Sequence, residues 1–249
     1  MSESVTDILK QLEKLNEAAG VSVYVPSLNK AVRFKNLNLK QQKDLLKSSI
    51  DDTLTRLSFT TKFFNIIKEN AIDYIDVNKL LIIDRLSIAI TLRTTGLSSI
   101  YKTIDLNDLI KQIQTTPIDM SVLATTADIQ NLTVKLEAPT LDVDNDVSLA
   151  TIAKLKNVSD RDVKTQIGEL FIHEIVKFIQ AVTFKTEDGE QTVIFANLNT
   201  NDKITITEKL PSTITNKILD FIKAYRTFEN NFITYNNTMV EIDSSFFNV

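Results

Sequence analysis

The chain carries one histidine, His173, and its surroundings are the first place to look for chemistry. The run His173-Glu174-Ile-Val-Lys177 differs by one residue from the HExxH motif of zinc metalloproteases, with lysine where the second imidazole is required. Because the chain has a single histidine and no cysteine, it cannot supply that second ligand. The sequence therefore argues against a zinc hydrolase, and it predicts that His173 is an exposed or half-buried residue of a helix.

Acidic residues at a spacing of two form a second candidate site. Asp142, Asp144 and Asp146 begin like a calcium-binding loop, in which carboxylate oxygens alternate along the chain. The loop motif also needs glycine at its sixth position and glutamate at its twelfth, where this chain has Val147 and Ala153. The pattern therefore favours a solvated acidic loop over a metal site.

The remaining enzyme signatures are weaker still. Glu169 and Glu174 lie about 140° apart around one helix, so they do not form the carboxylate pair of a glycosidase. Four scattered glycines cannot build a glycine-rich phosphate loop. We therefore predict that the protein is not an enzyme and binds no cofactor or metal. A net charge of −4 argues against nucleic acid as a partner, and the short apolar runs argue against a membrane span.

The elements that would position any site can be predicted from periodicity. Residues 4–19 have apolar positions at helical spacing. We expect this helix to cover the core, and a partner-binding arm is the alternative. Residues 21–34 alternate around a five-residue turn that begins at Pro26, which predicts a β-hairpin. A helical stripe opens at Leu39, capped by Asn38, and runs to about Asn70 with a pause at Asp51-Asp52.

Residues 77–93 are apolar on more than one side, which predicts a buried central helix capped by Asp76 and ended by Gly96. Further along, we expect helices at 105–113 and 211–228 and a strand at 130–137. A hairpin is predicted around Glu187-Asp188-Gly189, and a last one across Asn236-Asn237. Residues 201–208 fit a strand or a short helix.

Together these elements predict an α+β protein that is predominantly helical, with two or three small antiparallel β-hairpins. We expect residues 1–96 to form an N-terminal helix, hairpin and helical bundle. Residues 97–150 are expected to be an irregular linking region with one strand, and residues 151–249 to hold C-terminal helices and hairpins. One continuous domain is the alternative.

Candidate protein contacts lie at the hairpin and at the C-terminal tail. Two phenylalanines near a chain end either dock on the core or form a hook for a partner, and the sequence leaves both open. The predicted interaction residues are Val23, Val25, Pro26, Leu28, Phe34, Phe246 and Phe247.

Several runs along the chain are similar to one family. The segments Val23-Tyr-Val-Pro-Ser-Leu28, Phe34-Lys35 and Leu39-Lys-Gln-Gln-Lys-Asp-Leu-Leu46 resemble the baseplate hub assembly proteins of T-even-type contractile-tailed bacteriophages. So do Ile82-Ile-Asp-Arg-Leu86 with Leu92-Arg93, and Ile242-Asp-Ser-Ser-Phe-Phe247. This family includes a hub subunit and a hub assembly catalyst, and the chain length is nearer to that of the catalyst.

The resemblance implies a role in viral tail assembly, in which the central hub of the baseplate is built before the tail tube. "Catalyst" there means promotion of assembly, so the resemblance supplies no catalytic residues. The expected function is that of a non-enzymatic assembly chaperone or scaffold for hub or tape-measure proteins in the host cell cytoplasm. The alternative is a permanent structural subunit of the virion baseplate hub, and homo-oligomer formation is left open.

Overall fold

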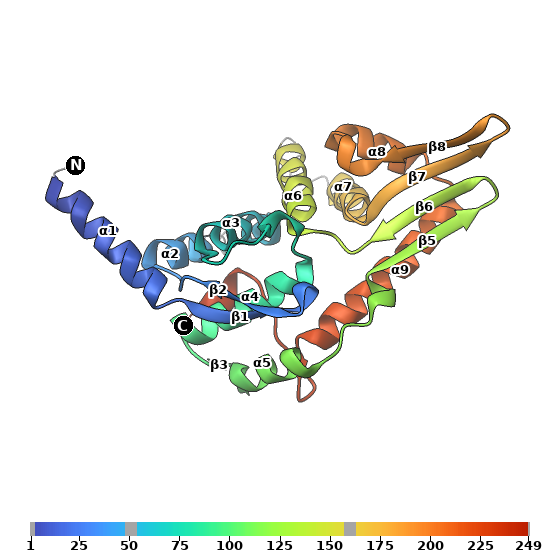
Figure 1. Cartoon of the computed structure of the whole chain (residues 1–249). Coiled ribbons are helices and arrows are strands. Elements are labelled where there is room, and N and C mark those ends of the chain that lie inside the picture. Colours follow the sequence, from blue (N-terminus) through green and yellow to red (C-terminus); the bar gives the residue numbers. More distant parts are fainter. Residues whose placement is uncertain (1–2, 48–53, 157–162, 249) are drawn as a thin grey trace. The chain divides into compact units, whose positions relative to one another are not determined.

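A computed structural model describes residues 3–47, 54–156 and 163–248 of the chain. Its contacts divide the chain into two compact units, each with its own core. Unit 1 is Met1–Thr116 together with Ile233–Val249, and unit 2 is Pro117–Phe232 (Figure 1). The segment 97–150 contributes to both units. Helices account for 59% of the structure and all strand pairs are antiparallel, which confirms the α+β class.

Unit 1 begins with a helix and a hairpin. Helix α1 spans Glu3–Ala18, and strands β1 (Val21–Val25) and β2 (Lys30–Phe34) follow, as predicted. The connection between the strands is one residue shorter than predicted, because Lys30 already pairs with Val25. It consists of a 3-10 turn, η1 (Pro26–Leu28), closed by Asn29 in the left-handed conformation at φ 47°.

Four helices form the bundle of unit 1. They are α2 (Leu39–Lys47), α3 (Thr55–Asn70), α4 (Ile82–Gly96) and α5 (Leu106–Thr115). Asn38 Oδ1 accepts from the Gln41 amide at 2.9 Å, so the predicted cap of α2 is confirmed. The predicted pause at Asp51-Asp52 lies outside the described residues.

Helix α4 is the buried centre of unit 1, as predicted, and packs against β1 and α5. Its predicted start is wrong. Asp76 caps a separate 3-10 turn, η2 (Val77–Lys79), and Leu80 and Leu81 are extended before α4 begins. The apolar spacing in the sequence continues through this break, because Val77 and Leu80 before α4 are buried as are Ile82 and Ile83 at its start.

Short elements complete unit 1. Strands β3 (Ile100–Tyr101) and β4 (Ile104–Asp105) form a small hairpin, and Asp105 caps α5. Near the end of the chain, β9 (Thr234–Tyr235) pairs with β10 (Thr238–Met239). Asn236 and Asn237 both have positive φ, at 48° and 61°, which is the signature of the two-residue turn predicted there. The chain ends in the 3-10 helix η5 (Ser244–Phe247).

Unit 2 is built on a four-stranded sheet in the order β5-β6-β7-β8. The strands are β5 (Ala124–Ile129), β6 (Leu132–Glu137), β7 (Ile179–Thr186) and β8 (Gly189–Ile194). The hairpin at Glu187-Asp188 and the strand β6 were predicted. Strand β5 was not predicted, because its only buried residue is Ala127 and its sequence has little apolar alternation.

Four helices accompany the sheet: α6 (Leu141–Leu155), α7 (Val163–Val176), α8 (Thr200–Glu208) and α9 (Ser212–Phe232). Short 3-10 turns lie at η3 (Met120–Val122) and η4 (Phe195–Asn197). Figure 1 shows α9 running alongside β5, and Phe178 packs edge-on against Tyr225 of α9 with ring centroids 5.4 Å apart. The prediction of a solvated acidic loop at Asp142, Asp144 and Asp146 is wrong, because these residues lie in the first two turns of α6.

Candidate interaction surface

The helix α1 has an apolar stripe that unit 1 does not cover. Its side chains recur at helical spacing, so they share one face of the helix. The exposed fractions are 42% for Val5, 57% for Ile8, 50% for Leu9, 50% for Leu12 and 64% for Leu15. Our favoured prediction, that this helix covers the core, is therefore wrong, and the alternative of a partner-binding arm remains.

The last turns of α1 are attached to the residues that directly follow strand β2. Lys35 Nζ lies 3.4 Å from Glu13 Oε1 and 3.0 Å from Glu17 Oε1, and the hydrogen bond with Glu17 raises the pKa of Lys35. Asn36 Nδ2 donates to the Ala19 carbonyl at 3.1 Å. A Cβ at Gly20 would lie 2.4 Å from Ile72 Cδ1 and 3.1 Å from the carbonyl oxygens of Glu17 and Phe34, so a larger residue there would displace the Ile72 side chain. Figure 1 shows α1 running outward from this attachment.

The seven predicted interaction residues all lie in unit 1, but most do not reach its surface. Val23, Val25, Phe34 and Phe246 are fully buried, Phe247 is 2% exposed, and Pro26 is buried. Leu28 is 40% exposed. Of the two options for the tail, the structure shows docking on the core. A partner contact at these residues stays a prediction.

The hairpin is held to α4 by one buried carboxylate, Asp84. Its Oδ1 accepts from the Ser27 amide at 2.8 Å, and its Oδ2 accepts from the Ser27 hydroxyl and the Leu81 amide, each at 2.6 Å. Asp84 is fully buried, and burial raises its pKa although these three hydrogen bonds oppose the rise. Asp84 therefore caps α4 and positions η1 at the same time.

We expect the stability that Asp84 contributes to depend on pH in an unusual direction. Its folded-state pKa lies above the ordinary value of 3.8, so the folded chain binds the proton more tightly than the unfolded chain does. The protein therefore loses stability as the pH rises from 3.8 through the folded-state pKa. Asp84→Asn should destabilise by about 1–3 kcal/mol, because an amide nitrogen then faces N–H and O–H donors. Urea unfolding from pH 4 to 7 should show that the difference in free energy of unfolding between the wild type and Asp84→Asn becomes smaller as pH rises. A difference that grows with pH would contradict this.

The C-terminal tail is held by Arg93 of α4, which is 5% exposed. Its Nη1 donates to the carbonyls of Phe246 and Asn248, the latter at 3.1 Å, and its Nη2 donates to the Ile100 carbonyl at 3.3 Å. The guanidinium also lies 5.1 Å from the Phe246 ring centroid and 5.4 Å from that of Tyr101. Burial lowers the pKa of Arg93. This arrangement fixes the tail against α4.

In unit 2, five ionised side chains from α6, the end of α7 and α9 form a chain of alternating charge. Lys177 Nζ lies 2.8 Å from Asp144 Oδ1 and 3.1 Å from Glu174 Oε2. Arg226 pairs with Glu174 and with Glu229. Burial lowers the pKa of Lys177, but Asp144 and Glu174 outweigh burial and raise it. Burial likewise raises the pKa of Glu174, but Lys177 and Arg226 lower it overall.

This ion chain explains both acidic candidates of the sequence. Lys177, which stands where a zinc protease would have its second histidine, neutralises Glu174 one turn away. Asp144, expected in a solvated loop, is 3% exposed because it faces that same lysine. The i, i+3 spacings of Glu174 with Lys177 and of Arg226 with Glu229 are the local sequence signals for the network. No local spacing joins these two pairs to each other or to Asp144.

His173 is buried rather than exposed or half-buried, with 2% of its surface accessible, so that prediction is wrong. Burial lowers the pKa of its imidazole more than Glu169 raises it. Within residues 3–47, 54–156 and 163–248 there is no group of three or more His, Asp or Glu side chains placed to hold a metal ion. In the same residues no helix is long and apolar enough to cross a bilayer.

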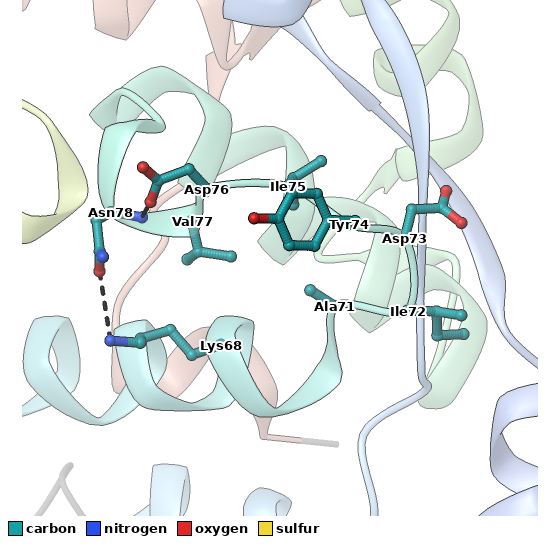
Figure 2. A pocket seen from close by; sticks show the side chains of 9 residues that line it. All are labelled: Lys68, Ala71, Ile72, Asp73, Tyr74, Ile75, Asp76, Val77 and Asn78. Atoms are coloured by element: carbon teal, nitrogen blue, oxygen red, sulfur yellow. Dashed lines mark hydrogen bonds between the residues drawn. The ribbon is translucent and has the colours of Figure 1, made fainter.

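A shallow hollow of about 380 Å³ lies in unit 1 where the chain leaves α3 (Figure 2). It is lined by Lys68 and the segment from Ala71 to Asn78. Lys68 Nζ donates to Asn78 Oδ1 at 3.3 Å, and the Asn78 amide donates to Asp76 Oδ1 at 3.2 Å. These polar groups close the loop on α3 and cap η2, so the hydrogen bonds serve the loop's own structure.

Comparison of the chain with protein-family models, with curated proteins and with solved structures finds no match. The comparisons therefore add nothing to the geometry described above, in which the most distinctive surface feature is the exposed apolar stripe of α1.

Proposed function

We propose that the protein is a non-enzymatic assembly factor for the baseplate hub of a contractile phage tail, and that α1 is the helix by which it docks on its client. The observation that carries the docking role is the apolar stripe Val5, Ile8, Leu9, Leu12 and Leu15, exposed by 42–64%. The resemblance of the hairpin and helix runs to baseplate hub assembly proteins supports the viral setting.

A physical argument connects the stripe to a partner. With 16 residues, α1 is only slightly longer than the limit of about 12–15 residues below which even alanine-rich isolated helices are marginal in water. Helices of this length are normally stabilised by packing their apolar face. Lys35 and Asn36 hold the C-terminal turns of α1, while its apolar stripe stays exposed. A client that covers the stripe would supply the missing packing.

The spacing of the stripe indicates the kind of client surface. Val5, Ile8, Leu12 and Leu15 follow the alternating three- and four-residue steps of a coiled-coil seam. The opposite face carries Asp7, Lys10, Glu13, Lys14 and Glu17, which keep it in water. This pattern fits an amphipathic helical segment of a hub or tape-measure protein.

The docking role predicts that surface changes in α1 affect binding and not folding. The double variant Ile8→Gln/Leu12→Gln should lower the affinity for the client at least about tenfold, because each side chain buries apolar surface on binding. Its free energy of unfolding should change by less than about 0.5 kcal/mol per substitution. The measurement is co-purification of the phage's hub and tape-measure proteins, followed by titration of the one retained.

The matched control is Lys10→Gln/Lys14→Gln, two substitutions on the charged face of the same helix. It should leave client binding within about twofold of the wild type. Equal binding by both double variants would remove α1 as the docking element.

Mass spectrometry of purified particles and of infected-cell lysate separates the assembly factor from the structural alternative. Abundance in lysate with absence from particles is the result expected for a transient factor. A fixed copy number in particles would instead identify a built-in subunit of the baseplate hub.

A further inference from the structure

The sheet of unit 2 has an open edge at β8. All six residues of this strand are exposed, and among the described residues β8 pairs only with β7. Proteins usually protect edge strands with charges, proline or a bulge. Apart from Glu190, which pairs with Lys185 of the neighbouring strand, the residues of β8 carry no charge and no proline, and the irregularity in the sheet lies between β6 and β7 instead. The backbone of β8 is therefore available to a further strand.

The opposite edge of the same sheet is protected. Helix α9 runs along β5, and Lys217 Nζ of α9 donates to the backbone carbonyl of Asp128 in β5 at 2.6 Å. A cationic side chain on an edge carbonyl is one of the devices that blocks strand addition. Of the two edges of this sheet, β8 is therefore the one that can accept a further strand.

The hairpin geometry determines which backbone groups of β8 face outward. Thr186 and Gly189 close a two-residue turn, and residues that close such a turn bond to each other. Bonding to the neighbouring strand then alternates along an antiparallel pair, so Gly189, Gln191 and Val193 bond to β7. The amides and carbonyls of Glu190, Thr192 and Ile194 point away from β7.

We propose that β8 is an interface between two copies of this chain, which pair antiparallel about a two-fold axis at Thr192. In this register Thr192 lies opposite Thr192 of the second copy, and Glu190 lies opposite Ile194 of the second copy. All three outward-facing residues of each strand then find backbone partners. The two sheets become one sheet of eight strands.

Two features of the β8 side chains favour this pairing. Thr133, Thr183 and Thr192 form one row across the sheet, with the Thr183 and Thr192 hydroxyls 2.9 Å apart, and the pairing continues that row into the second copy. On the other face Val182 lies beside Val193, which is 38% exposed. Gln191 of the second copy covers Val193 there.

Charge selects the antiparallel arrangement and hence the two-fold symmetry. Glu187 and Asp188 form an acidic tip on the hairpin. Parallel pairing would place the two acidic tips side by side. Antiparallel pairing about Thr192 separates the Asp188 residues by eight strand positions, about 27 Å, well beyond the Debye length of about 8 Å at physiological salt.

The interface is small, which sets its expected strength. One pair of short strands buries less than the roughly 1,200 Å² typical of stable complexes. The dimer of the full chain should therefore be weak and depend on concentration. The proposal is independent of the docking role of α1.

An engineered cysteine tests the contact directly, because the chain contains no cysteine of its own. Antiparallel residues directly opposite each other have Cα atoms about 5.5 Å apart, a distance that a disulfide spans. Under mild oxidation Thr192→Cys should give at least tenfold more linked dimer than Thr126→Cys, which places the thiol on the same face at the protected edge. The Ile8→Gln/Leu12→Gln variant should not affect this linkage.

Sedimentation of the cysteine-free protein supplies the second measurement. The wild type should show a concentration-dependent monomer–dimer equilibrium, and Thr192→Pro should weaken it at least tenfold. The Thr192 amide does not bond to β7, so proline there leaves the hairpin's own hydrogen bonds intact. Monomer at every concentration, equal linkage of both cysteine variants, or a dimer unaffected by Thr192→Pro would each overturn the proposal. Linkage of Thr192→Cys to a different protein in infected cells would assign the edge to another strand and would also overturn it.

Discussion

Replacing Lys177 with methionine is expected to destabilise unit 2 by about 3–5 kcal/mol, the usual cost of leaving buried charge without its partner. The Lys177 side chain is 9% exposed and stands between Asp144, which is 4% exposed, and Glu174. Methionine matches the length of the lysine stem but leaves two carboxylates facing each other across an apolar side chain. Urea unfolding at pH 7, followed by circular dichroism, measures the loss.

The matched control is Lys185→Met. Lys185 also pairs with a glutamate, Glu190, at 3.5 Å, but both side chains are about 60% exposed. Exposed pairs of this kind contribute about 0–1 kcal/mol, so this variant should unfold nearly as the wild type does. Equal losses in the two variants would show that burial of the ion chain does not govern its contribution.

A second substitution tests whether the stability lost in Lys177→Met comes from the carboxylates left without a partner. Adding Asp144→Asn to Lys177→Met removes one of the stranded charges, so the double variant should be more stable than the sum of the two single losses predicts. Strict additivity would contradict direct coupling between Asp144 and Lys177.

Replacing Phe247 with alanine should destabilise unit 1 by about 3–5 kcal/mol, the usual range for removing a buried aromatic ring. Phe247 is 2% exposed, and its ring centroid lies 5.5 Å from that of Phe63 and 6.1 Å from that of Phe59. Its loss opens a cavity between η5 and α3 that these rings cannot fill without moving. Chemical unfolding of the purified variant measures the change.

Tyr74→Ala is the aromatic control, because the Tyr74 side chain is fully exposed and should contribute within about 0.5 kcal/mol. The comparison also separates the two roles that the sequence left open for the tail. If Phe247 is a core residue, client binding by Phe247→Ala should be normal at temperatures where the variant remains folded. Lost binding without lost stability would assign the tail to a partner.

Local chemistry alone was enough to predict many elements of this protein. Asn236 and Asn237 form a turn with positive φ, and Gly189 after the Glu187-Asp188 turn has φ 129°, backbone conformations that asparagine and glycine tolerate. Asn38 begins α2 because its side chain accepts the amide three residues later. The amphipathic stripe of α1 and the buried centre α4 followed from spacing alone. Each of these features depends on residues that are close in sequence.

The errors arose where distant residues decide the outcome. Asp142, Asp144 and Asp146 look like a loop by composition, but acidic residues also suit the first turn of a helix, and Lys177 neutralises Asp144 there. His173 is buried by packing that its own helix does not reveal. No local pattern brings Arg226 and Glu229 of α9 to Glu174 of α7.

What the sequence determined by itself is the set of helices and turns with local signals, the amphipathic character of α1, and a composition with one histidine and no cysteine. The tertiary structure decided which apolar residues are covered: Phe246 and Phe247 are enclosed by α2, α3 and Arg93, while the stripe of α1 stays exposed. The physical reason is that turns and caps depend on neighbouring dihedral angles and hydrogen bonds. Burial depends on which segments meet in space, and an apolar face has the same sequence whether the chain itself or another molecule covers it.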